Sequence, residues 1–250
     1  MCTDKLGLVS VSFRKNTVLE ILEAMKKAGL FYVEWGSDIH APWNDTDKLR
    51  EIARLQKEYG ITCSSYGTYF RLGENKTEEL QGYIDAARIL GTDILRLWCA
   101  TKSGSDMSED EKVYLLEECK KAERIARQND VVICMECHKS TFTENCDDAV
   151  DLMEQINSRN FRMYWQPFQW QSVKQNIENA GKIAPYTKNI HVFNWKEKNR
   201  FPLEMAIDEW RAYLENFLKP RVLLLEFMPN NTLEELIIEA NALKKIVGEE

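Results

Sequence analysis

The chain has 250 residues, of which 44% are hydrophobic and 29% are charged, a composition typical of a soluble globular protein with a large core. Its formal net charge of −7 argues against a nucleic-acid partner, because the phosphate backbone would be repelled. No apolar stretch approaches the roughly 18 residues of a membrane span, and residues 1–10 lack the features of a signal peptide. We therefore expect a cytoplasmic protein with no membrane partner.

The seven cysteines are scattered along the chain, and their odd number argues for reduced thiols rather than a disulfide framework. Cys134 and Cys137 form a C-x-x-C pair, which is the spacing of some redox and zinc sites. Both fall in a predicted strand, where residues three apart point to opposite faces. We therefore interpret the pair as packing residues.

Short apolar runs alternate with longer amphipathic stretches along the whole chain. The apolar runs predict eight strands, at residues 6–13, 31–35, 61–66, 93–98, 131–137, 161–166, 189–195 and 221–227. The amphipathic stretches predict eight helices, among them 17–29, 45–60, 108–130, a short one near 172–182, and 231–247. Ser108 is a typical helix start, and Gly29 and Gly60 are typical helix ends.

Strict alternation of strands and helices predicts an α/β protein with a parallel sheet. Eight such units in 250 residues, with no linker or change of composition, match a single (β/α)8 TIM barrel domain over residues 1–250. A doubly wound open sheet is the alternative. It is disfavoured because "VSFRKNT" stands after the first strand, where a dinucleotide-binding fold would carry G-x-G-x-x-G.

Polar side chains collect at the ends of the predicted strands, which is where barrel enzymes carry their chemistry. A single histidine in a strand is usually a core residue, but all three histidines of this chain fall at or near strand ends. Burying a carboxylate is costly unless the group is paired, so glutamates that end apolar strands need an explanation. The residues concerned are Glu34, His40, Arg96, Glu136, His138, Gln166, His191 and Glu226.

Four of these residues come from consecutive strands, the predicted fifth to eighth, and can converge on one point inside a barrel. They are Glu136, Gln166, His191 and Glu226. Their oxygen and nitrogen atoms suit a hard or borderline divalent cation. We predict one bound metal ion, Mn²⁺, Mg²⁺ or Co²⁺, with Zn²⁺ as a further candidate. Such an ion would neutralise the two buried glutamates, and His138 would lie in the pocket beside it.

From "VEWGSDIHAP" through "MECHKSTFTEN" and "IHVFNW" to "LLLEFMP", the chain resembles the sugar phosphate isomerase/epimerase superfamily of xylose isomerase-like barrels. That superfamily includes ketose 3-epimerases, inosose dehydratases and hydroxypyruvate isomerases. The resemblance implies a metal held by a Glu, an Asp, a His and a second Glu, of which Glu136, His191 and Glu226 match. Gln166 stands at the Asp position, and Gln169 stands where many members have a His. A neutral amide is a weaker ligand than a carboxylate, so weaker metal binding is expected.

The resemblance also implies that the two metal-bound glutamates transfer protons, which makes Glu136 and Glu226 the predicted catalytic pair. A metal that chelates a carbonyl and a neighbouring hydroxyl acidifies the C–H bond between them. One carboxylate can then remove this proton and the other can return it. We predict an enzyme, an epimerase or isomerase of a sugar or keto-sugar. The residues leave open which glutamate removes the proton.

Three other functions fit the same scaffold. A sugar lyase or dehydratase would begin with the same proton abstraction, and a non-catalytic sugar-binding barrel would have lost a ligand at Gln166. A DNA-repair enzyme of the endonuclease IV kind needs a histidine-rich zinc cluster, which three histidines do not supply. The predicted partner is a small sugar, with an unphosphorylated one preferred, and the chain could form a homo-oligomer. The predicted substrate contacts are His40, Arg96, Trp98, His138, Trp165, Gln169 and Lys196.

Overall fold

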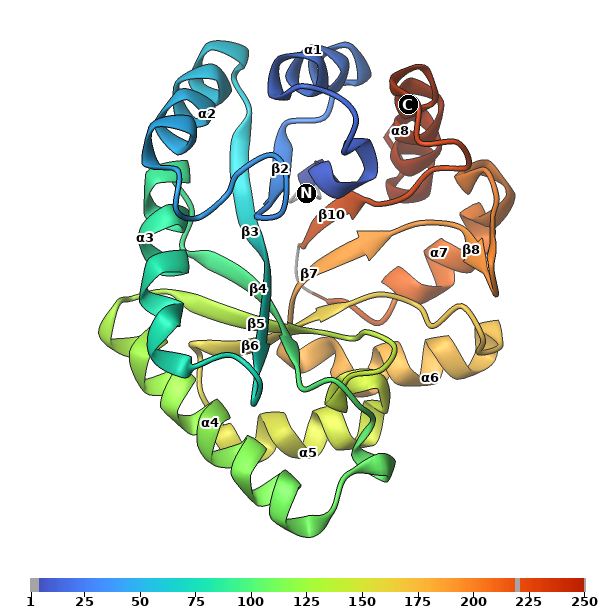
Figure 1. Cartoon of the computed structure of the whole chain (residues 1–250). Coiled ribbons are helices and arrows are strands. Elements are labelled where there is room, and N and C mark those ends of the chain that lie inside the picture. Colours follow the sequence, from blue (N-terminus) through green and yellow to red (C-terminus); the bar gives the residue numbers. More distant parts are fainter. Residues whose placement is uncertain (1–4, 219–220, 250) are drawn as a thin grey trace.

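The computed structural model describes residues 5–218 and 221–249. Eight parallel strands close into a barrel in the order β1-β10-β7-β6-β5-β4-β3-β2, and helices surround it (Figure 1). The predicted (β/α)8 barrel is therefore confirmed, and the open-sheet alternative is wrong. The strands are β1 (Lys5–Val9), β2 (Tyr32–Gly36), β3 (Thr62–Leu72), β4 (Ile94–Cys99), β5 (Val132–Glu136), β6 (Phe161–Trp165), β7 (Thr187–Val192) and β10 (Val222–Leu225).

Helices follow the strands and cover the outside of the barrel. Four of them, α1, α4, α6 and α8, begin with a capping box, in which a Ser or Thr and a Glu or Gln satisfy each other's backbone N–H groups. These caps fix where each chain segment turns back after leaving a strand. The helices are α1 (Val18–Ala28), α2 (Thr46–Tyr59), α3 (Leu80–Leu90), α4 (Glu109–Gln128), α5 (Cys146–Ile156), α6 (Val173–Ile183), α7 (Ile207–Leu214) and α8 (Leu233–Val247).

The core has two layers, because successive residues of a strand face opposite sides of the sheet. Outward-facing side chains pack against the helices in one large apolar cluster. Inward-facing side chains form a smaller cluster inside the barrel, which includes Val9, Ile94, Cys134, Tyr164 and Leu224. Cys134 belongs to the inner cluster and Cys137 to the outer one, and both are buried free thiols. The two side chains thus lie on opposite sides of the sheet, as strand alternation requires.

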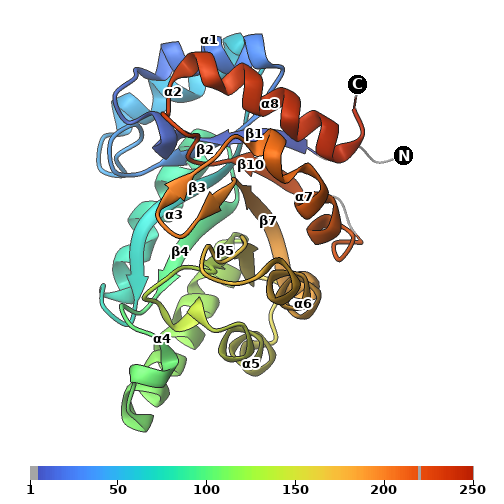
Figure 2. The same ribbon diagram turned by 90° about the vertical axis from the view of Figure 1, so that its right-hand side faces the viewer.

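The chain departs from the predicted strands at the carboxyl end of the barrel, where it turns to build the site. The first strand ends at Val9 and continues as a 3-10 turn over Ser10–Phe13, instead of running to residue 13. After β7 the chain forms a small antiparallel hairpin of β8 (Trp195–Lys196) and β9 (Asn199–Arg200). In Figure 2 this hairpin lies at the end of the barrel opposite the last turn of α8. Among the described residues, no helix is long and apolar enough to cross a bilayer.

Candidate active site

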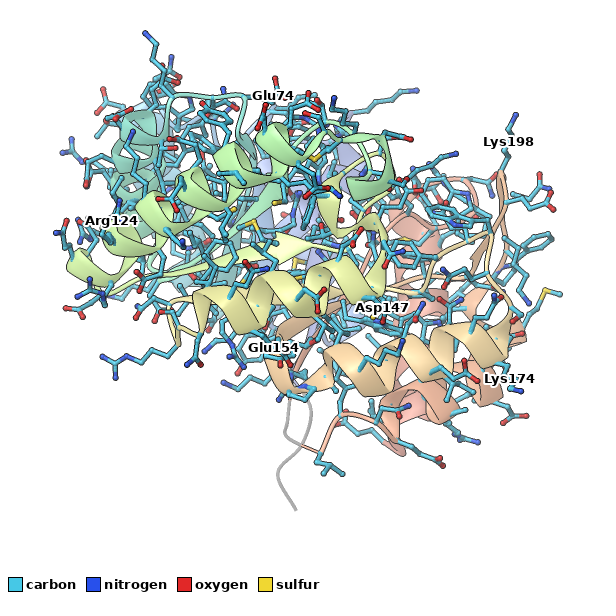
Figure 3. The ribbon with its side chains drawn as sticks, turned by 90° about the horizontal axis from the view of Figure 1, so that it is seen from below. Glu74, Arg124, Asp147, Glu154, Lys174 and Lys198 are labelled. Atoms are coloured by element: carbon cyan, nitrogen blue, oxygen red, sulfur yellow. The ribbon has the colours of Figure 1, made fainter. Side chains whose placement is uncertain are left out.

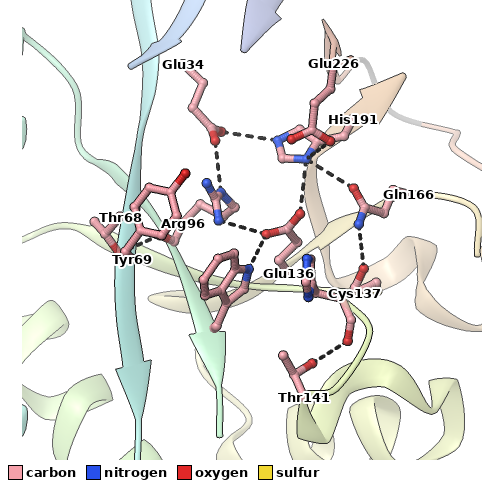
Figure 4. Close-up of polar contacts among 12 residues, drawn as sticks. Glu34, Thr68, Tyr69, Arg96, Glu136, Cys137, Thr141, Gln166, His191 and Glu226 are labelled. Carbon is pink, nitrogen blue, oxygen red and sulfur yellow. Dashed lines mark hydrogen bonds and ion pairs between the residues drawn. The ribbon is translucent and has the colours of Figure 1, made fainter. Parts of the chain in front are cut away.

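Six buried polar side chains meet at the carboxyl end of the barrel (Figure 4). Each comes from a different strand or from the residue just after it, so closure of the barrel brings together positions far apart in the sequence. None of the six is more than 8% exposed. They are Glu34 on β2, Arg96 on β4, Glu136 on β5, Gln166 after β6, His191 on β7 and Glu226 after β10.

Arg96 lies between two of the carboxylates. Its Nε donates to Glu34 Oε1 at 2.9 Å, and its Nη1 donates to Glu136 Oε2 at 2.8 Å. Trp98 Nε1 donates a further hydrogen bond to the same Glu136 oxygen at 2.6 Å. Buried charges are tolerated when they are paired and hydrogen-bonded in this way. The second Glu136 oxygen, Oε1, is left facing His191.

The charges of this cluster hold both paired glutamates in the ionised form. Burial alone would raise the pKa of Glu34, but Arg96 and then His191 lower it to about 2. Burial likewise opposes ionisation of Glu136, yet Arg96 and His191 bring its pKa well below the usual range. Burial would lower the pKa of Arg96, but Glu136, Glu34 and Glu226 raise it instead. At neutral pH the cluster therefore contains charged groups.

His191 has a different environment at each ring nitrogen. Its Nε2 lies 3.5 Å from Glu34 Oε2, while its Nδ1 lies 3.4 Å from both Glu136 Oε1 and Glu226 Oε2. Burial would lower the pKa of His191, but Glu226 and Glu34 raise it well above its ordinary value. Nδ1 is therefore a site for a cation, either a proton or a metal ion. With Nε2–H directed at Glu34, the lone pair of Nδ1 points to the other carboxylates, as in many metal-binding histidines.

The four predicted metal ligands fit a divalent ion. Ligand atoms of Glu136, His191 and Glu226 all lie within 4.8 Å of one another. Gln166 donates its Nε2 to the Cys137 carbonyl at 2.9 Å, which turns its Oε1 toward His191 Nδ1 at 3.3 Å. With His191 neutral, as a metal ligand must be, three carboxylates against the one guanidinium of Arg96 leave two negative charges, which a divalent cation would balance. The donors are oxygen and imidazole nitrogen, the set that Mg²⁺, Mn²⁺ and Zn²⁺ accept.

Above this cluster lies a cavity of about 390 Å³ whose lining includes Arg96, Glu136, Gln166 and Glu226. Three more of the predicted substrate contacts also line it, namely Trp98, His138 and Gln169. The His138 ring lies 4.9 Å from the Trp98 ring, and its Nδ1 lies 2.7 Å from the Lys139 carbonyl. A backbone carbonyl only accepts, so Nδ1 carries a proton in this contact and donates to it.

Three predicted substrate contacts lie outside this cavity. His40 is buried, and its Nε2 lies 3.2 Å from the Asn16 carbonyl. Trp165 points outward and packs on Trp210, because it precedes Gln166 and successive residues alternate between the two faces. Lys196 forms a 2.8 Å ion pair with Glu209 beside a neighbouring cavity. We therefore leave these three out of the site.

Two features of the site were not predicted from the sequence. Glu34 was expected at a strand end, but its contact with His191 was not. A glutamate inside the apolar run "FYVEW" was the available sequence signal. Gly67 on β3 was also missed, although its lack of a side chain makes room for the ion pair. A Cβ atom there would lie 2.5 Å from Glu34 Oε1 and 2.9 Å from Arg96 Nη2.

The fold and this buried cluster define the class of protein. The chain belongs to the xylose isomerase-like TIM barrel family, whose model matches residues 22–235. The comparison with curated proteins gives no match.

Solved structures share the fold at low sequence identity. The probable 3-DHS dehydratase AsbF of Bacillus anthracis superposes with a TM-score of 0.80 at 14% identity, over 96% of this chain and 98% of that one. D-psicose 3-epimerase of Clostridium cellulolyticum H10, solved with D-tagatose, gives 0.70 at 12% identity, over 98% and 100%. A xylose isomerase-like protein of Mycobacterium smegmatis, solved with magnesium, gives 0.73 at 13%, over 98% and 97%. These likenesses concern the fold.

Proposed function

We propose that the protein is a metal-dependent epimerase or isomerase that acts on a sugar or keto-sugar by moving a proton next to a carbonyl. The observation that carries the proposal is the placement of Glu136 and Glu226. A carboxylate oxygen of each lies 3.4 Å from the same nitrogen of His191, and both residues line one cavity. Family membership supports the proposal, because epimerases share the fold.

In this proposal Glu136, Gln166, His191 and Glu226 hold one divalent ion, Mn²⁺, Mg²⁺ or Co²⁺, with Zn²⁺ as a further candidate. When bound, such an ion polarises the substrate carbonyl and so acidifies the adjacent C–H bond. Glu34 positions His191 by accepting from its Nε2–H, and Arg96 fixes the direction of the Glu136 carboxylate. The Gln166 amide is fixed by its bond to the Cys137 carbonyl.

Glu136 and Glu226 carry the proton in this mechanism. Arg96 and Trp98 occupy Glu136 Oε2, so Glu136 acts through Oε1. The two carboxylates approach His191 from strands on different sides of the site (Figure 4). Return of the proton to the same carbon from the opposite face inverts that carbon, whereas return to the neighbouring carbon converts ketose to aldose. Trp98 and His138 line the cavity and would contact the sugar there.

A dehydratase is the second candidate, because the fold is shared with a probable dehydratase at a TM-score of 0.80. The same proton abstraction would then be followed by loss of a hydroxyl from the next carbon. NMR of ketohexoses incubated in D₂O with the manganese-loaded protein separates the two. Deuterium at the carbon beside the carbonyl with all hydroxyls retained supports the epimerase or isomerase. Loss of a hydroxyl supports the dehydratase. No exchange with any ketose, keto acid or aldose tested would contradict proton transfer at this site.

A further inference from the structure

Three cations that the proposed mechanism does not use lie against aromatic side chains of the cavity wall. Three tryptophans line the cavity, and each has a cation over its ring. Arg71 Cζ lies 4.2 Å from the Trp98 ring centre, and Lys139 Nζ lies 5.4 Å from that of Trp170. Arg200 Cζ lies 4.7 Å from the Trp195 ring and 4.6 Å from that of Phe227. We call Arg71, Lys139 and Arg200 the cationic collar.

No collar residue forms an ion pair with any carboxylate in residues 5–218 and 221–249. This separates the collar from Arg14 and Arg96, the two arginines that line the cavity. Arg14 also lines the cavity but is paired with Asp38 at 2.6 Å, and Arg96 is paired with both Glu34 and Glu136. Cation–π contact positions a charge without neutralising it. The collar therefore keeps its positive charge next to the aromatic side chains that line the cavity.

The backbone conformation near each of the three collar residues is unusual. Ala100, Ser140 and Phe227 have φ of 59°, 57° and 52°, a region that non-glycine residues adopt rarely. Ala100 accepts a hydrogen bond from Arg71, Ser140 follows Lys139 in the chain, and Phe227 lies under Arg200. Such costly conformations cluster at ligand-binding sites. Each of the three cations thus lies next to a residue with an uncommon backbone geometry.

We propose that the substrate carries an anionic group, a carboxylate or a phosphate, at a position away from the reacting carbon. In the proposed function a divalent ion would balance the cluster at the cavity floor, which leaves the collar as excess positive charge in a chain whose net charge is −7. A cleft surrounded by charges of one sign raises the local concentration of ligands of the opposite charge. Lys139 is the collar residue that lines the cavity itself, so it contacts the anion, while Arg71 and Arg200 act at longer range. This inference rests on the proposed function.

Calorimetric titration of the magnesium-loaded protein with D-glucose, D-glucuronate and D-glucose 6-phosphate tests the inference. We expect both anions to bind at least about tenfold more tightly than glucose. Lys139→Gln should remove most of this preference and leave glucose binding unchanged, and Lys139→Arg should restore it. The preference should also fall with added salt. The tighter of the two anions identifies the anionic group.

The matched control is Lys174→Gln, a lysine in the first turn of α6 that does not line the cavity (Figure 3). This variant should keep the preference for the two anions over glucose.

The inference is wrong if neither anion binds more tightly than glucose, or if the preference survives Lys139→Gln combined with Arg200→Gln. The second result would place the anion on the metal ion or on Arg96. Deuterium exchange into neutral sugars without any anion preference would overturn this inference alone. An anion preference through Lys139 without exchange into any substrate would overturn the proposed function alone.

Discussion

Replacing Arg96 by Met should destabilise the protein strongly. Glu34 and Glu136 would lose the guanidinium that each contacts within 3 Å, in a site where neither carboxylate is more than 4% exposed. Breaking a buried ion pair from one side typically costs about 3–5 kcal/mol. For a chain of this size such a loss lowers Tm by roughly 10 °C. Urea unfolding at pH 7 and a thermal scan measure both quantities.

The pH dependence of this loss follows from Glu34. In the native protein its pKa is lowered to about 2, so its contribution to stability is present above its ordinary pKa and is lost as pH falls toward 2. In Arg96→Met, protonation of the buried Glu34 carboxylate stabilises the folded state, because a neutral carboxyl group costs less to bury than an unpaired charge. The stability difference between the two proteins should therefore be largest near pH 7 and should narrow toward pH 4.

The control for this experiment is Arg54→Met on α2. Arg54 contacts Glu51 and Glu58 at the surface, with half of its side chain exposed. Exposed pairs contribute about 0–1 kcal/mol, so this variant should unfold almost like the native protein. If Arg96→Met lost less than about 1 kcal/mol, or no more than Arg54→Met, the account of how the buried carboxylates are held would be refuted.

Four further outcomes are expected. Glu136→Gln and Glu226→Gln should each reduce deuterium exchange by at least about 100-fold while keeping the native circular dichroism spectrum, because each removes a base but keeps the side-chain size. Gln166→Asp should tighten Mn²⁺ binding, measured by calorimetry, because it adds a charged ligand. His138→Ala should mainly raise KM, since the ring is a cavity wall. Burial raises the pKa of Glu239 to about 7, so Glu239→Gln should stabilise the fold at pH 8 by about 1 kcal/mol, with the difference vanishing near pH 4.

Each of these outcomes has a clear opposite. Near-native exchange in Glu136→Gln would assign proton transfer to another base, and weaker Mn²⁺ binding in Gln166→Asp would remove that residue from the metal shell. A large fall in kcat at unchanged KM for His138→Ala would make its role chemical rather than one of binding. A constant stability difference for Glu239→Gln between pH 4 and pH 8 would mean that this carboxyl group does not titrate with folding.

The order of strands and helices was predictable because it depends on local patterns. Buried parallel strands are continuous apolar runs, and the helices between them are amphipathic and capped. The strand ends were less predictable. Apolar residues such as Val11 and Phe13 continue the pattern of β1, but they belong to a 3-10 turn that packs at the barrel mouth. The apolar pattern of residues 10–13 indicates that they are buried, but it does not distinguish a strand from a 3-10 turn.

The candidate site was predictable where a polar residue ended an otherwise apolar strand. A glutamate or histidine ending an apolar strand is costly, and the structure brings Glu136, His191 and Glu226 together. The wall was harder to predict, since any aromatic residue near a strand end is equally suited to core or cavity. Trp98 and Trp165 differ only in which face of the sheet they take, and one residue of register decides that. The collar depends on distances between loops, which sequence spacing does not give.

Titration of the purified protein with Mn²⁺, followed by calorimetry, tests the central claim most directly. The four donors at the carboxyl end of the barrel should bind one ion per chain. The same titration of His191→Ala should show this binding lost or strongly weakened, because Nδ1 lies within 3.4 Å of oxygens from the other three ligands. Saturable binding of one Mn²⁺ that depends on His191 is the result the account predicts. Absence of saturable binding, or equal binding by His191→Ala, would contradict it.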